Sequence, residues 1–155
     1  MSRFGHSGAT LLQTPASSYQ KQTEFQEALA FKPDIAIIVL GTNDVGISFS
    51  PLVKRNFVAD YRQLIDGFRT KANIAQFFLC IPPSIYPETD NRNIVLTRDI
   101  APLIRQVARE IGATVIDLQR ATSGHPGWFP DATHPNEAGA RAIAGEIGRV
   151  VLANR

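Results

Sequence analysis

The sequence is poor in cysteine, in long apolar runs and in clustered charge. Its one cysteine, Cys80, lies in the apolar run AQFFLCIPP, so an intramolecular disulfide is excluded and a buried packing role is predicted. No stretch reaches the roughly 18 consecutive apolar residues of a membrane span, and no export signal is visible. The 16 Lys and Arg residues nearly balance the 14 Asp and Glu residues without a basic run, which indicates neither a nucleic-acid nor a membrane partner. These absences favour a small or neutral molecule as the ligand.

What the chain does contain is enough apolar material for one folded domain. Apolar residues make up 44% of the sequence and charged residues 19%, both ordinary for a globular protein that buries a sizeable core. No internal repeat or low-complexity linker divides the chain. We therefore expect a single domain over residues 1–155.

Three short apolar runs predict strands. They are DIAIIVL at 34–40, AQFFLCI at 75–81 and ATVIDL at 113–118. The first run is continuous and is bounded by Pro33 and Gly41, which is typical of a parallel strand covered on both faces.

Between these runs, apolar residues recur at helical spacing. Helices are predicted over 21–31, 50–72, 94–112 and 136–155. Pro102 restricts the third of them, which should start near Asp99 or kink. The last helix is predicted to turn inward Ala140, Ile143, Ala144, Ile147 and Val151. Residues 119–135 are predicted to form a long loop, and the alternation of strands and helices predicts an α/β fold with a parallel sheet.

Polar residues that could take part in catalysis follow the predicted strands. Asn43 and Asp44 stand in GTND after the first strand, and Asp131 and His134 stand in FPDATHPNEAG before the last helix. An acid and a histidine this close suit the orienting and base members of a hydrolytic triad. Taken alone, the same residues favour a helix-capping cluster, and only the joint pattern with GTND and SGAT favours the catalytic interpretation. Ligands bind at the carboxyl ends of parallel strands, so these loops and the opening GHSGATLL are expected to share one end of the sheet.

Three of these segments carry a family resemblance. GTND, SGAT near the start and DATHPN before the last helix resemble three of the four sequence blocks of the SGNH hydrolases, also called GDSL esterases, in the same order along the chain. The resemblance implies a three-layer α/β/α, flavodoxin-like fold and hydrolysis of a small-molecule ester without a cofactor. The segments FGHSGATLL and WFPDATHPNEAG are most similar in sequence to the carbohydrate acetylesterase branch, which implies an acetylated carbohydrate as substrate.

The resemblance also assigns roles to individual residues. Gly8 would supply a backbone N–H and Asn43 a side-chain amide to the oxyanion hole, which stabilises negative charge on the carbonyl oxygen. Asp131 would orient His134, the general base. The family's nucleophilic serine lies in a Gly-Asp-Ser block on the first strand, and this sequence contains no Gly-Asp-Ser. We therefore expect a chain that begins after that strand, lacks its nucleophile and presents an open sheet edge at 34–40 that favours self-association.

Two alternatives remain open at this stage. One is a non-catalytic fragment or binding module. The other is an α/β-hydrolase-type esterase that uses Ser7, because GHSGA nearly matches the G-x-S-x-G nucleophile elbow. No His, Cys or carboxylate residues show metal-ligand spacing, so no metal is predicted.

Overall fold

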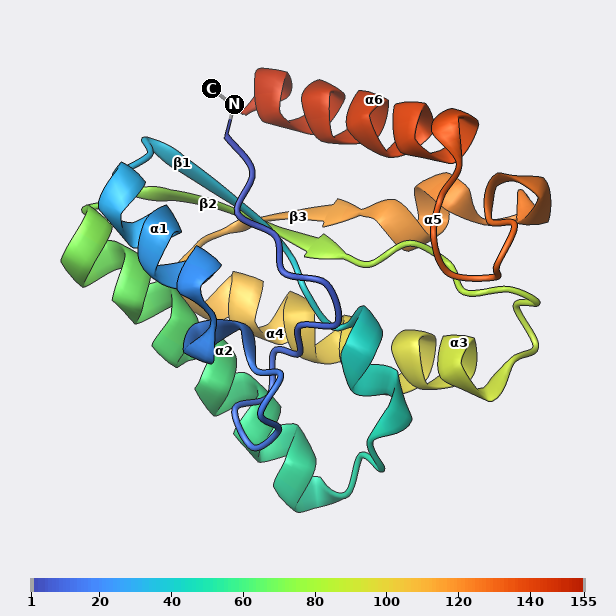
Figure 1. Ribbon diagram of the computed structural model, residues 1–155, viewed down its shortest axis with the longest axis horizontal. Helices are drawn as coiled ribbons and strands as arrows, with labels where there is room; N and C mark the ends of the chain where they lie inside the picture. The colour runs from blue at the N-terminus through green and yellow to red at the C-terminus, as the bar shows by residue number, and fades with distance from the viewer. Residues whose placement is uncertain (1, 155) are drawn as a thin grey trace.

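The structure, a computed structural model, describes residues 2–154 and contains one parallel sheet. Its strands are β1 (Ile35–Val39), β2 (Gln76–Ile81) and β3 (Thr114–Asp117), in the order β1-β2-β3. The three strands predicted from apolar runs are therefore confirmed. Because all three run in the same direction, their carboxyl ends meet at one end of the sheet, on the right of Figure 1.

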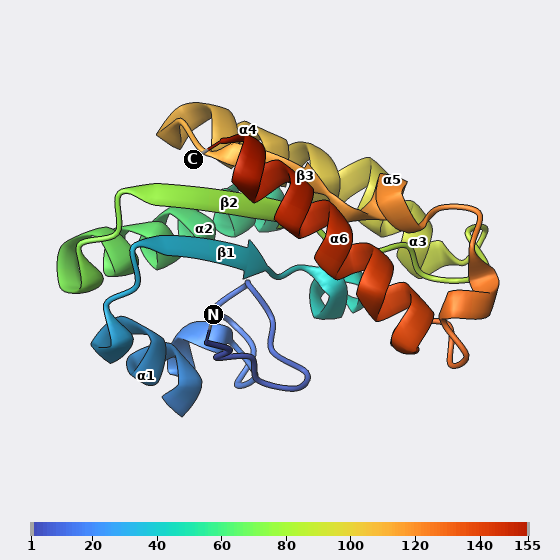
Figure 2. The same cartoon turned by 90° about the horizontal axis from the view of Figure 1, so that it is seen from above.

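Helices cover the two faces of this sheet and make three layers. Helices α1 (Thr23–Phe31), α2 (Pro51–Ala72) and α4 (Ala101–Ile111) lie on one face, and α6 (Glu137–Ala153) lies on the other (Figures 1 and 2). The larger apolar core fills the first interface, where Phe57, Tyr61 and Ile65 are fully buried. A smaller cluster under α6 includes fully buried Cys80, as predicted. The α/β fold with flanking helices is confirmed.

The sequence of helix α2 determines where this helix begins and ends. Ser50 caps it, since its hydroxyl accepts a hydrogen bond from the Val53 N–H at 3.3 Å, and Pro51 occupies the first turn, where no N–H is needed. The helix ends where Asn73 turns left-handed with φ of 58°. The predicted helix at 50–72 is therefore confirmed. No helix within the described range is long and apolar enough to cross a membrane.

Helix α4 begins at Ala101, two residues after Asp99, as predicted from Pro102, but helical structure precedes it. The chain enters α3 (Asn91–Val95), passes through a π-helical turn at Leu96–Ile100 and continues directly into α4, so the helical path begins eight residues before Asp99. The Ala101 N–H donates to the Leu96 carbonyl, five residues earlier. This wider turn accommodates the proline at the start of α4, where its missing N–H is not required.

The expectations for 119–135 and for the face of α6 are also corrected. A one-turn helix, α5 (Leu118–Thr122), follows β3 directly, and a 3₁₀ turn, η4 (Pro126–Trp128), lies within the supposed loop. Ala140 and Ala144 are exposed, contrary to the prediction, whereas Val151 is buried and Ile143 and Ile147 pack against the cluster under α6, as predicted. The reason is that α6 packs on β3 and α5 and leaves much of its own length uncovered.

Strand β1 is not covered on both faces as predicted. It forms one side of the sheet, Ile35 and Ile37 are only half-buried, and Val39 is 42% exposed. No other strand in the part of the chain that the structure describes pairs with its outer edge.

Candidate active site

Asp131 and His134 form a hydrogen-bonded pair in the loop before α6. His134 Nδ1 lies 2.6 Å from Asp131 Oδ2. Asp131 Oδ1 accepts the backbone N–H groups of Thr133 at 3.0 Å and of His134 at 2.7 Å. An ionised carboxylate can only accept, so Nδ1 carries the proton and Nε2 is left as the acceptor. The contact expected between these two side chains is present.

Electrostatics keep Asp131 ionised. The backbone N–H of His134, then the His134 side chain and the backbone N–H of Thr133, hold the pKa of Asp131 far below its usual range. Both side chains are exposed, His134 by 79% and Asp131 by 56%, so the pair contributes little to stability. A carboxylate fixed in this way can hold an imidazole in one tautomer.

The capping interpretation of Asp131 and His134 is wrong. Helix α6 is capped by Asn136, whose Oδ1 accepts the Gly139 N–H at 3.1 Å. The Asn136 amide also donates to the Gly127 carbonyl at 2.9 Å. The carboxylate of Asp131 binds N–H groups ahead of the helix, in the loop itself.

Gly139 permits a close approach between α6 and the preceding loop. A Cβ atom at this position would lie 2.9 Å from Pro135 Cβ and 3.1 Å from both Cβ and the carbonyl oxygen of Trp128. Such contacts are too short, so only glycine fits without movement of the loop. The glycine of HPNEAG thus allows α6 to pack directly against Pro135 and Trp128.

Aromatic residues support the same loop from inside. Phe129 is buried against the Tyr86 ring, with centroids 5.3 Å apart. The Tyr86 N–H donates to the Ala132 carbonyl at 2.9 Å, and Ala132 itself adopts a φ of 73°, which is rare for a non-glycine residue. The Tyr86 hydroxyl donates to the Thr122 carbonyl and accepts the His125 N–H. These contacts tie the loop that carries His134 to the segment after β2.

The second group of candidate residues lies where β1 ends. The 3₁₀ turn η2 (Thr42–Gly46) places Asn43 so that its Nδ2 donates to the Ala9 carbonyl at 2.9 Å. An amide nitrogen carries two hydrogens, so one remains for a ligand. Gly8 precedes Ala9, is exposed and has a φ of 76°, and its N–H finds no acceptor among residues 2–154. Two neutral donors with free N–H groups are therefore neighbours.

Sequence reasoning placed Asp44 beside Asn43 at the end of the first strand but assigned it no role. This residue is fully buried, and its carboxylate accepts the backbone N–H groups of Leu11 at 2.9 Å and Leu12 at 3.0 Å. Burial raises its pKa, although the two N–H groups oppose that rise. Its partners lie 32 and 33 residues away in the chain, so no local pattern could identify them.

The Asp131–His134 pair and the Gly8–Asn43 donors belong to loops at the carboxyl end of the sheet. The loops of η2 and of 123–136 both follow strand ends on that side in Figure 1. No hydrogen bond joins the two groups within the described residues. Ser7 lies in a turn, and residues 2–6 form no strand, so the nucleophile elbow that an α/β-hydrolase needs is absent there.

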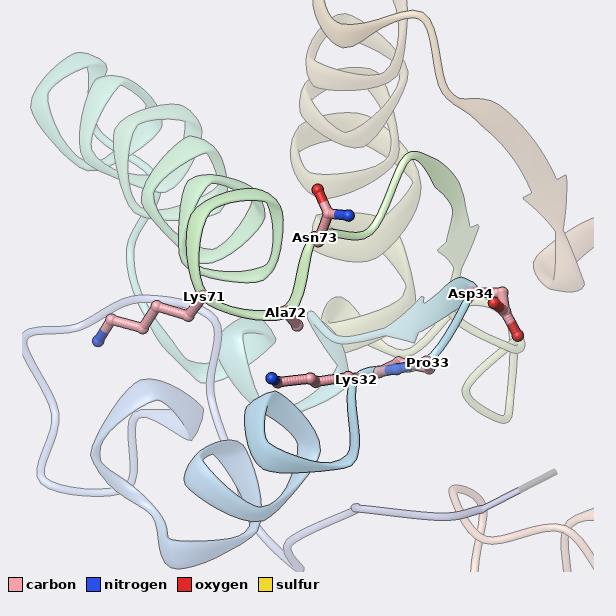
Figure 3. Close-up of a pocket in the computed structure, with 6 residues that line it drawn as sticks. All are labelled: Lys32, Pro33, Asp34, Lys71, Ala72 and Asn73. Carbon is pink, nitrogen blue, oxygen red and sulfur yellow. The ribbon is translucent and has the colours of Figure 1, made fainter.

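Two surface hollows lie at opposite ends of the sheet. One of about 360 Å³ lies at the opposite end of the sheet, where α1 and α2 end and β1 begins; its lining residues are Lys32, Pro33, Asp34, Lys71, Ala72 and Asn73 (Figure 3). The other, about 300 Å³, lies between the loop 45–49 that follows Asn43 and the segment 91–99. Among the residues that the structure describes, no three His, Cys, Asp or Glu side chains gather as metal ligands would.

Comparison with known proteins identifies relatives of this chain. The chain is 31% identical over 166 residues to an acetylxylan esterase of Xylanibacter ruminicola, which covers 96% of this chain and 35% of that protein. The chain thus spans about a third of the length of that curated relative. Among solved structures, an acetyl xylan esterase, AlAXEase, superposes with a TM-score of 0.75 at 19% identity over 95% of this chain and 78% of that one.

An acetylxylan esterase from Geobacillus stearothermophilus superposes with a TM-score of 0.71 at 22% identity, over 92% of this chain and 68% of that one. At these identities the two solved structures establish a shared fold. The model of the GDSL-like lipase/acylhydrolase family matches residues 2–142, which include all three segments that carry the resemblance seen in the sequence. The chain therefore belongs to the GDSL-like lipase/acylhydrolase family.

Proposed function

We propose that this chain carries the acid, base and oxyanion donors of a serine esterase that removes acetyl groups from a carbohydrate. The observation that carries the proposal is the Asp131–His134 hydrogen bond, which leaves His134 Nε2 free to accept a proton. Gly8 and Asn43 supply uncharged N–H donors of the kind that bind an oxyanion.

The reaction follows from these roles. A serine hydroxyl attacks the acetyl carbonyl, and His134 Nε2 takes its proton while Asp131 holds the resulting imidazolium. The Gly8 N–H and the Asn43 amide bind the oxygen that becomes negative. When the tetrahedral intermediate collapses, His134 returns the proton to the departing sugar oxygen. Water then repeats the sequence on the acyl-enzyme and releases acetate and the free serine.

An acetylated xylan-type saccharide is the substrate class that we propose. The curated relative and the two solved structures described above are named acetylxylan esterases, and this is the support for an acetyl group on a sugar. The 300 Å³ hollow beside η2 is lined in part by Ser48, Asn91 and Arg98, groups that can hydrogen-bond to sugar hydroxyls.

The serine of this proposal comes from a segment outside these 155 residues. The sequence contains no Gly-Asp-Ser, and β1 has an outer edge that an additional parallel strand could occupy. One solved relative is a catalytic mutant of the Geobacillus esterase in which a serine is replaced by alanine, so a serine serves catalysis in that protein.

The test compares the 155-residue chain with a form preceded by a Gly-Asp-Ser strand, using an aryl acetate and acetylated xylo-oligosaccharides. We expect little turnover from the chain as it stands and a gain with the added segment. His134→Ala should abolish that gain, whereas His125→Ala, a change at another exposed loop histidine, should preserve it. Robust hydrolysis by the chain alone that is lost on Ser7→Ala would refute the proposal. Absence of turnover in both forms would favour a non-catalytic module.

We further propose that the outer edge of β1 mediates self-association of the 155-residue chain. Residues Ile35–Val39 contain no charged or proline residue that would oppose pairing with another strand. Sedimentation velocity should show a dimer or larger species that Val39→Lys reduces. A chain that is monomeric at high concentration would contradict this proposal.

A further inference from the structure

We propose that Asp44 positions the two oxyanion donors, Gly8 and Asn43, relative to each other. This inference rests on the proposed function. Asp44 touches neither substrate nor the reacting atoms, so its role is that of a positioning residue.

Three hydrogen bonds join η2 to the segment that carries Gly8. Asp44 accepts from Leu11 at 2.9 Å and from Leu12 at 3.0 Å, and Asn43 donates to the Ala9 carbonyl at 2.9 Å. All three bridge two segments more than 30 residues apart in the chain. The Gly8 N–H and the Asn43 amide therefore have a fixed separation only while this clamp holds.

The clamp also sets the orientation of the Asn43 amide. If the amide were rotated by 180° about its last bond, its carbonyl oxygen would face the Ala9 carbonyl, and two acceptors would repel each other. The Ala9 oxygen thus holds the nitrogen side in place and leaves the second N–H outward. Since Asp44 fixes Leu11 and Leu12, it fixes the position of the Ala9 carbonyl two residues earlier.

Burial makes this clamp rigid. Ala9, Leu11 and Leu12 are all at most 3% exposed, as is Asp44. A buried carboxylate is costly unless its oxygens are paired, and here each oxygen accepts one backbone N–H. Loss of this acceptor would leave two buried N–H groups without partners, so the segment would shift to regain contacts.

The chain supplies a matched control for a purely structural role. Asp60 on α2 accepts the backbone N–H of the next residue, Gln13, at 2.8 Å. It thus ties the same segment to the fold by the same kind of bond. Asp60 differs from Asp44 in being half-buried, in lying far from Asn43 in the sequence and in holding a residue further from Gly8.

The experiment uses the chain as it stands and sodium acetate, the product of the proposed reaction, as the probe. Two-dimensional proton–nitrogen NMR spectra record the signals of the Gly8 N–H and of the Asn43 side-chain amide while acetate is added. The titration is performed on wild type, Asp44→Asn and Asp60→Asn. In wild type we expect both signals to shift with one dissociation constant. Asp44→Asn replaces one acceptor by a donor and should weaken acetate binding about five- to tenfold, whereas Asp60→Asn should change it less than about twofold.

The outcomes separate this inference from the proposed function. If acetate moves neither signal in wild type, the oxyanion assignment itself fails. If wild type responds and the two variants weaken binding equally, Asp44 only ties down the segment and the positioning role is refuted. Melting temperatures and signal dispersion check that each variant is folded. Should Asp44→Asn unfold, Asp44→Ser, which retains one acceptor oxygen without a charge, is measured against the same expectation.

Discussion

Replacement of Gly139 by alanine tests whether close packing behind His134 governs this loop. In an ordinary helix, glycine to alanine stabilises by roughly 0.5–1 kcal/mol because it restricts the unfolded chain. At Gly139 the new Cβ would meet Pro135 Cβ at 2.9 Å and Trp128 at 3.1 Å, and neither contact is with the end of a flexible side chain. Overpacking of this kind costs about 1–3 kcal/mol. We therefore expect Gly139→Ala to destabilise the protein by about 1–2 kcal/mol.

The same helix provides the control. A Cβ at Gly145 meets nothing within 4 Å, so Gly145→Ala should stabilise by about 0.5–1 kcal/mol. The two variants should then differ by about 1.5–3 kcal/mol in urea denaturation, or by roughly 3–12 °C in melting temperature. The Nδ1 proton signal of His134 should also change in Gly139→Ala alone, because Pro135 adjoins that histidine. An equal gain in stability from both substitutions would show that the packing argument is mistaken.

Three further predictions concern the cap, the buried thiol and the acid. Asn136→Ala should lower the free energy of unfolding by about 1–2 kcal/mol in urea denaturation. Asn136→Asp keeps the cap but loses the donor to Gly127, so its free energy of unfolding should lie between those of Asn136→Ala and wild type. Equal losses in the two variants would contradict a role for both contacts. Burial raises the pKa of Cys80 to about 12, so iodoacetamide at pH 8 should modify it only after unfolding, and rapid labelling of the native protein would argue against that burial. Because the pKa of Asp131 is lowered, the contribution of its carboxylate to stability is present above the ordinary pKa near 4 and is lost as pH falls through the lowered pKa. NMR of the Asp131 carboxyl carbon should show the lowered titration midpoint, and His134→Ala should raise that midpoint.

Strand positions and the long helix could be predicted from sequence because one interaction dominates each of them. The runs at β1 and β2 are continuous and apolar, and the fold buries nearly all of β2 and alternate residues of β1. In α2, apolar residues recur on one face over 22 residues, so the period is unambiguous. The π turn before Pro102 could not be predicted in the same way, since it is a local adjustment that apolar spacing does not encode.

Short and weakly apolar elements were harder to predict. Helix α5 has five residues, too few for a helical period to show, and an aspartate cap at Asp117 was its only signal. Ala140 and Ala144 carry too little apolar surface to decide which face of α6 is buried. For the site, the Asp131–His134 contact could be expected because it spans three residues, whereas the partners of Asp44 could be found only from the structure.

The Asp131–His134 pair joins residues that are close in the sequence, whereas the clamp made by Asn43 and Asp44 joins distant ones, and the two should therefore open separately. Asp131 takes all its partners from the next three residues, so little loop-closure entropy is lost when that pair forms. The clamp between η2 and the segment at 9–12 closes a loop of more than 30 residues and depends on the first segment of the chain. Native-state hydrogen exchange should therefore report two opening reactions of different free energy. A fluctuation that releases the first segment would remove the oxyanion donors and leave the imidazole aligned, so the two halves of the proposed site would be lost at different temperatures.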